Sequence, residues 1–93
     1  MPTISQAKKE KIAEQILHYL FSSAPQPKFT AEIAREVARD EEFTKSILSE
    51  LKQQNLVIEV TKNNAGFLYL KRQRWRLSNK AYEIYNSFNQ KQQ

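Results

Sequence analysis

Apolar residues recur along this chain with two different periods, and these periods predict its elements. Over residues 7–21 the apolar positions fall at i, i+4, i+5 and i+8, which predicts an amphipathic helix that buries Ile12, Ile16, Leu17 and Leu20. Stripes of the same period predict a second helix over residues 31–39 and a third over residues 40–54. A last helix is expected to follow Ser78 and to continue to about Asn89.

Between the third and the last helix the pattern changes to one of strands. Residues 56–62 predict an outgoing strand, residues 63–66 have turn chemistry, and residues 67–77 predict the returning strand. The apolar phase changes along the returning strand, so we expect a bulge near residues 71–73. Phe29 is either a short strand or a hydrophobic staple. The sequence therefore predicts an α+β fold with a three-helix core, a two- to three-stranded sheet and a C-terminal helix.

Residues suited to helix ends stand at the predicted boundaries. Thr30 is expected to be the N-cap of the second helix, and Asp40 that of the third. Glu41 and Glu42 suit the positive end of the third helix dipole. Asn55 is able to take the left-handed conformation that ends this helix.

Length and composition favour a single domain over residues 1–93, with residues 1–6 and 90–93 expected to be flexible. The chain has no cysteine, which excludes disulfides and thiolate metal sites. No apolar run reaches the roughly 18 residues of a membrane span, and no signal peptide is evident. We expect a cytoplasmic protein without a membrane association, a cofactor or a bound metal; His18 stands alone.

The net charge of +5 is distributed unevenly. Residues 1–59 contain eight Lys or Arg and nine Asp or Glu, whereas residues 60–82 contain six Lys or Arg and no acid. A local basic segment attracts phosphate through counterion release, and a nearly neutral remainder does not oppose it. The predicted hairpin is therefore a candidate nucleic-acid contact.

Three motifs add a family resemblance. They are Thr30-Ala-Glu-Ile-Ala-Arg-Glu-Val in the second helix, Ser46-Ile-Leu-Ser-Glu-Leu-Lys-Gln-Gln-Asn-Leu-Val from the third helix into the hairpin, and Trp75-Arg-Leu-Ser-Asn-Lys-Ala after it. In this order they resemble the winged helix-turn-helix superfamily of prokaryotic DNA-binding transcription regulators, with a MarR- and PadR-like flavour. The resemblance covers roughly residues 12–85. It implies a recognition helix over residues 40–54 that enters the major groove and a basic wing over residues 56–77 that contacts phosphates.

Two positions depart from the pattern of that superfamily. Ala38-Arg39 stands where the turn usually has glycine followed by an apolar residue. The recognition helix begins with Asp40, Glu41 and Glu42, where polar or basic residues are usual. Carboxylates that face DNA would repel it, so these acids favour the alternative of a protein-interaction module in a larger assembly.

Helix spacing gives the candidate contacts of the recognition helix. Thr44, Lys45, Ser46, Ser49, Lys52 and Gln53 are expected to be exposed, since Phe43, Ile47, Leu48 and Leu51 form the core face. Lys45, Ser46 and Ser49 are the preferred groove-facing residues, with Lys52 beside them. The alternative is a solvated helix face.

The wing supplies the remaining candidates. Alternation along the returning strand places Arg72, Arg74 and Arg76 on one face. Lys62, Asn63, Asn64 and Lys71 are the further wing candidates near the turn. The alternative is an edge strand that charge protects against aggregation.

Other residues have weaker claims. Arg35 and Arg39 are possible backbone contacts on the second helix, but neighbouring glutamates are able to pair with them. Phe67, Tyr69 and Trp75 would stack on single-stranded DNA or RNA if they were exposed, but aromatic residues here are more often core.

The stripe of Ala81, Ile84, Tyr85 and Phe88 on the last helix either folds back on the domain or forms a dimer interface. We favour a homodimer that binds double-stranded DNA and regulates transcription. The sequence shows no effector pocket, and neither a catalytic constellation nor a phosphate loop, so an enzyme is not expected.

Overall fold

Seven elements make up the part of the chain that the computed structural model describes, residues 5–60 and 73–91, with side chains described as far as Phe88. They are α1 (Gln6–Ser23), β1 (Lys28–Phe29), α2 (Thr30–Val37), α3 (Glu41–Gln53), β2 (Val57–Val60), β3 (Arg74–Leu77) and α4 (Asn79–Lys91). The predicted α+β class and element order are confirmed. The predicted turn at residues 63–66 and most of the predicted bulge lie outside the described residues.

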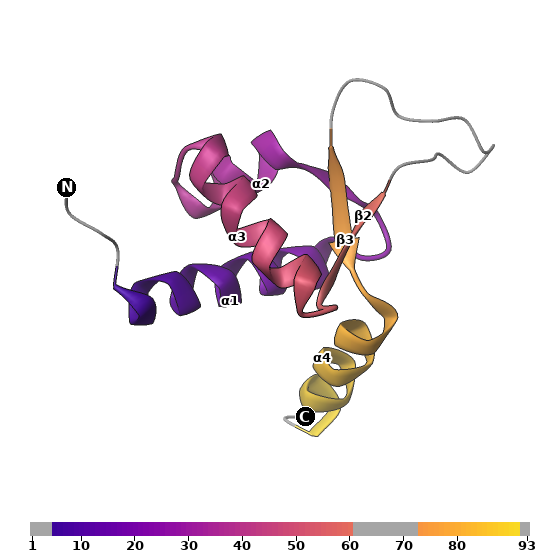
Figure 1. Ribbon diagram of the computed structural model, residues 1–93. Coiled ribbons are helices and arrows are strands. Elements are labelled where there is room, and N and C mark those ends of the chain that lie inside the picture. Colours follow the sequence, from indigo (N-terminus) through magenta and orange to yellow (C-terminus); the bar gives the residue numbers. More distant parts are fainter. Residues whose placement is uncertain (1–4, 61–72, 92–93) are drawn as a thin grey trace.

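The first helix lies along α2 and α3 and supplies much of the core (Figure 1). Its predicted stripe is buried, and Leu20 and Ile16 have at most 1% of their surface exposed. Ser5 caps the helix, since its hydroxyl oxygen accepts a hydrogen bond from the backbone N–H of Lys8 at 3.2 Å.

The start of α2 differs from the prediction by one residue. Phe29, and not Thr30, occupies the N-cap position, and Glu32 Oε1 accepts a hydrogen bond from the Phe29 N–H at 2.9 Å. The hydroxyl of Thr30 is engaged elsewhere, because it accepts a hydrogen bond from the Trp75 indole N–H at 2.8 Å. A tertiary contact with β3 therefore replaces the local capping bond.

The turn between α2 and α3 uses an alanine in the left-handed conformation. Ala38 has φ 58° and ψ 45°, and the N–H of Arg39 reaches back to the carbonyl of Ala34 at 3.0 Å. Asp40 then caps α3 as predicted, with its Oδ1 accepting from the Phe43 N–H at 2.7 Å. This turn fixes the direction in which α3 leaves α2.

We expect Ala38→Gly to raise the free energy of unfolding by about 0.5–1 kcal/mol, because glycine takes positive φ without the Cβ clash that alanine suffers. Ala13→Gly, in the right-handed interior of α1, is the matched control and is expected to lower stability by about 1 kcal/mol. Urea unfolding of the three proteins measures both changes. A loss of stability in both variants would contradict the argument.

The core face of α3 contains a residue that the spacing assigned to the surface. Thr44 is fully buried, so the prediction of its exposure was wrong. It lies three, four and seven residues before Ile47, Leu48 and Leu51, which places its methyl group in their stripe. Phe43 is only half-buried at the border of this face. Asn55 ends the helix region with φ 63°, as expected.

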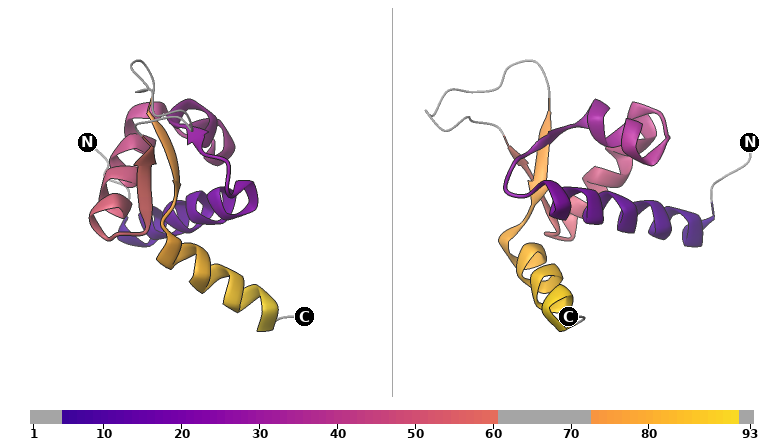
Figure 2. Two further views of the ribbon diagram at one scale, coloured as in Figure 1. Left: turned by 90° about the vertical axis from the view of Figure 1, so that its right-hand side faces the viewer. Right: turned by 180° about the vertical axis from the view of Figure 1, so that it is seen from behind.

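The three strands form one antiparallel sheet in the order β1-β3-β2. Lys28 pairs with Trp75 on one side of β3, and Glu59 pairs with Trp75 on the other. The arginine-bearing strand is therefore central at Arg74 and Trp75 (Figure 2), whereas Arg76 and Leu77 pair with β2 alone among the described strands. Protection of an edge strand does not explain Arg74.

Side chains alternate across β3 and connect the sheet to the helices. Trp75 and Leu77 are buried in the core with the apolar stripes of α1, α2 and α3. After Leu77 the hydroxyl oxygen of Ser78 accepts a hydrogen bond from the Ala81 N–H at 3.1 Å, which confirms Ser78 as the cap of the last helix. The helix α4 then projects away from α2 and α3 (Figure 2). Within the described ranges, no helix has the length and hydropathy needed to cross a membrane.

Candidate nucleic-acid interface

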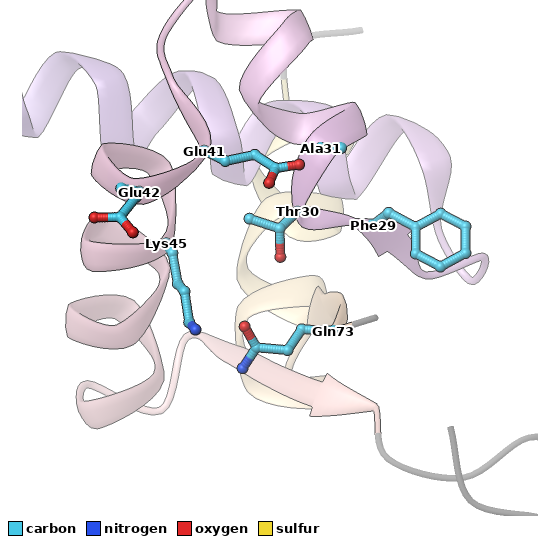
Figure 3. A pocket seen from close by; sticks show the side chains of 7 residues that line it. All are labelled: Phe29, Thr30, Ala31, Glu41, Glu42, Lys45 and Gln73. Carbon is cyan, nitrogen blue, oxygen red and sulfur yellow. The ribbon is translucent and has the colours of Figure 1, made fainter. Parts of the chain in front are cut away.

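A hollow of about 560 Å³ lies between the first turns of α3, the start of α2 and the sheet. Its lining comprises Phe29, Thr30, Ala31, Glu41, Glu42, Lys45 and Gln73. The side chains of Lys45 and Gln73 point toward one another across it (Figure 3). The hollow therefore separates the exposed side of α3 from Gln73, the residue before β3, and polar side chains project into it from both sides.

Acidic residues share this hollow. Figure 3 shows the Glu41 carboxylate directed toward Ala31 and the Glu42 carboxylate directed away from Gln73. Asp40 has its capping bond to the Phe43 N–H, so helix capping accounts for its position. The two glutamates remain beside Lys45, where their charge opposes the approach of phosphate.

The preferred candidates on α3 are exposed, as the spacing predicts. Lys45, Ser46 and Ser49 all lie on the surface of this helix. The Ser46 hydroxyl donates to the Phe43 carbonyl at 2.6 Å, which leaves its oxygen with acceptor capacity. In the part of the chain that the structure describes, Lys45 forms no ion pair.

Lys52 has a partner within the domain. Its Nζ lies 3.2 Å from Glu59 Oε1, and the other carboxylate oxygen of Glu59 accepts a hydrogen bond from Gln73 Nε2 at 3.1 Å. Neither Glu59 nor Gln73 was among the residues predicted from sequence. The sequence did contain a signal for a partner of Glu59. Side chains alternate along a strand, so Glu59 lies on the same face as buried Val57, where a carboxylate needs a polar partner.

The two described arginines of the basic strand share the sheet face opposite Trp75, as predicted. Arg74 and Arg76 are both half-buried and pair across the sheet with Val60 and Ile58. The Arg74 guanidinium lies 4.2 Å from the centroid of the Phe29 ring, and Arg76 donates to the Leu77 carbonyl at 2.9 Å. These contacts hold both guanidinium groups close to the sheet.

Several predicted residues cannot be placed with these. Lys62, Asn63, Asn64, Phe67, Tyr69, Lys71 and Arg72 lie outside the described residues. Arg35 and Arg39 are exposed and form no ion pair within the described ranges, so the alternative in which neighbouring glutamates pair with them is not observed there. Trp75 is 1% exposed, which excludes base stacking by this residue.

The predicted stripe on α4 divides between the core and the surface. Ala81 is buried in the core of its own domain, and Tyr85 packs on Phe21 with ring centroids 5.6 Å apart. Burial, together with the carboxylate of Glu14, raises the pKa of Tyr85. Ile84 and Phe88 are 55% and 62% exposed. These two side chains are therefore the part of the stripe that is open to a partner.

Several solved structures share this arrangement of helices and strands. The chain superimposes on S. aureus MepR in complex with DNA with a TM-score of 0.70, at 16% identity, over 90% of this chain and 69% of that one. The chain has the winged helix-turn-helix fold. The MarR family regulator SPO1453 from Silicibacter pomeroyi gives a TM-score of 0.65 at 15% identity, over 86% of this chain and 52% of that one. A double mutant of Lactococcus lactis ZitR gives 0.68 at 18% identity, over 97% and 60%.

The winged-helix chain spans about half to two thirds of the length of these structures. No protein-family model matches the sequence, and no curated protein matches it. The TM-scores of 0.65–0.70 establish the fold that the three motifs predict, and at identities of 15–18% the likeness is one of fold alone.

Proposed function

We propose that this winged helix binds double-stranded DNA and regulates transcription, with α3 in the major groove and the basic residues of the wing on phosphates. The observation that carries the proposal is the fold shared with MepR, a protein whose structure includes DNA. The concentration of six Lys or Arg without an acid over residues 60–82 supports it independently.

The proposed contacts on α3 are Lys45, Ser46 and Ser49. Lys45 projects into the hollow from the exposed side of the helix, where its ammonium is available to a guanine edge or a phosphate. The Ser49 hydroxyl suits donation to either, whereas the Ser46 hydroxyl would have to exchange its bond to the Phe43 carbonyl for one to DNA. Arg35 and Arg39, exposed on and after α2, are proposed backbone contacts.

The proposed phosphate contacts of the wing are Lys62, Asn63, Asn64, Lys71, Arg72, Arg74 and Arg76. For Arg74 and Arg76 the contacts that hold each guanidinium group near the sheet support the assignment. A guanidinium that is already ordered loses less conformational freedom when it binds phosphate. Their sheet face also lacks an acid among the described residues of β2 and β3.

Fluorescence anisotropy with a labelled random duplex at several salt concentrations tests the proposal. The wild type is expected to bind with steep salt dependence, and Arg74→Gln/Arg76→Gln to reduce the slope of log K against log salt by about 0.9 for each lost contact. Lys8→Gln/Lys11→Gln removes the same charge from the exposed face of α1 and is expected to leave the slope unchanged. Absence of wild-type binding at about 50 mM salt would reject the proposal.

The second part of the proposal is a homodimer formed through α4. Ile84 and Phe88 line one shallow surface with Lys80, Glu83 and Ser87. Two large apolar side chains, both more than half exposed on one helix face, are typical of an interaction surface. A twofold dimer would place two recognition helices about one DNA turn apart.

A protein partner is the second candidate function, and one observation favours it. Glu41 and Glu42 line the same hollow as Lys45, so a basic peptide would find complementary charge there. A wild type that fails to bind any duplex at low salt would favour this candidate over DNA.

A further inference from the structure

We propose that Glu59 is a positioning residue that withholds Lys52 from DNA, so that Lys45 alone of these two lysines on α3 contributes to phosphate binding. This inference rests on the proposed DNA-binding function. Glu59 comes from β2 and connects the recognition helix to the central strand. The sequence-based assignment of Lys52 as a DNA contact is thereby replaced with a structural role.

The first observation is that both oxygens of one carboxylate are used. Glu59 Oε1 accepts from Lys52 Nζ at 3.2 Å, and Glu59 Oε2 accepts from Gln73 Nε2 at 3.1 Å. The backbone carbonyl of Gln73 in turn accepts from the Thr30 N–H at 3.2 Å. A continuous set of polar contacts therefore links α3, β2, the residue before β3 and the start of α2.

The second observation is the difference between two lysines on one helix face. Lys45 and Lys52 are seven residues apart, close to two full turns, so their side chains leave α3 in nearly the same direction. Lys52 has a carboxylate partner, whereas Lys45 has none among the described residues. On this helix face Lys52 is therefore ion-paired, whereas Lys45 is not paired within the described residues.

Charge compensation has a defined effect on DNA binding. Salt dependence reports the cations that neutralise phosphate, and a lysine already paired with a carboxylate adds no net positive charge. A surface ion pair contributes little to the free energy of unfolding. Glu59 is therefore expected to change the net charge of the surface proposed to face DNA more than the stability of the fold. The Glu59 side chain is 23% exposed, close enough to the surface for its own charge to repel phosphate.

The experiment compares the salt dependence of random-duplex binding for the wild type and four variants. Glu59→Gln keeps the shape and the acceptor for Gln73 but frees Lys52, so its slope is expected to be steeper by about 0.9. Between 50 and 200 mM salt this corresponds to roughly a further 3- to 4-fold loss of affinity. The double variant Lys52→Met/Glu59→Gln removes both charges of the pair and is expected to keep the wild-type slope. Lys52→Met alone leaves the Glu59 carboxylate without its partner and is expected to weaken binding.

Lys45→Met is the matched control and is expected to make the slope shallower by about 0.9. A shallower slope for Lys52→Met/Glu59→Gln, or an unchanged slope for Glu59→Gln, would overturn the inference while leaving DNA binding intact. A wild type that does not bind would overturn both proposals. Circular dichroism checks that both variants with glutamine at position 59 keep the fold.

Discussion

Replacing Trp75 with alanine is expected to lower the free energy of unfolding by about 3–5 kcal/mol. The indole is 1% exposed, occupies the central strand and packs against helices on the inner face of the sheet. Alanine would leave a large cavity there and remove the hydrogen bond to Thr30. Since a small domain is stable by about 5–15 kcal/mol, this loss is a large part of its total stability. Urea unfolding followed by circular dichroism measures the loss.

Two control variants separate the parts of this effect. Thr30→Val removes the acceptor of the indole N–H and is expected to cost about 1–3 kcal/mol, because a buried donor is left without a partner. Trp75→Phe keeps an aromatic ring and is expected to cost less than Trp75→Ala. If Trp75→Ala lowers the free energy of unfolding no more than Thr30→Val does, the cavity is not the main cause of the loss.

Placing two carboxylates on α4 is expected to abolish the proposed dimer. In Ile84→Glu/Phe88→Glu each glutamate would have to lose its water inside an apolar interface, a cost of several kcal/mol. We expect the variant to be monomeric at concentrations where the wild type is a dimer, a shift of about 100-fold or more in the dissociation constant. Sedimentation equilibrium measures this shift.

Asn86→Glu is the control for added charge on the same helix. Asn86 is exposed and lies on the side of α4 opposite Ile84, so its replacement is expected to leave association unchanged. A wild type that is monomeric throughout, or an Ile84→Glu/Phe88→Glu variant that still dimerises, would show that α4 does not form the interface.

Features that depend on neighbouring residues in the chain could be predicted from sequence. The helix stripes, the caps Asp40 and Ser78 and the positive φ of Asn55 follow from spacing and side-chain chemistry within a few residues. The three motifs were also sufficient to predict the fold. They include the residues that pack beneath the turn and those that lead from the sheet into the last helix.

Features that depend on tertiary partners could not be predicted in the same way. Thr30 has the chemistry of an N-cap, but its hydroxyl accepts from Trp75, which is distant in sequence. Ala81 belongs to an apolar stripe whose two outcomes, core and interface, differ only in what packs against it. The pairing of Lys52 with Glu59 likewise depends on the angle between α3 and β2. The periodicity of a sequence shows which residues share one face of a helix or strand, but not which element packs against that face.

The central position of β3 also has a consequence for synthesis on the ribosome. The chain emerges from its N-terminus, so α1, β1, α2 and α3 are exposed to solvent before β3 appears. Until Leu77 has left the exit tunnel, β1 lacks the strand with which it pairs and the helices lack the indole between them. A chain that ends before Leu77 would therefore lack a closed core and be open to proteolysis.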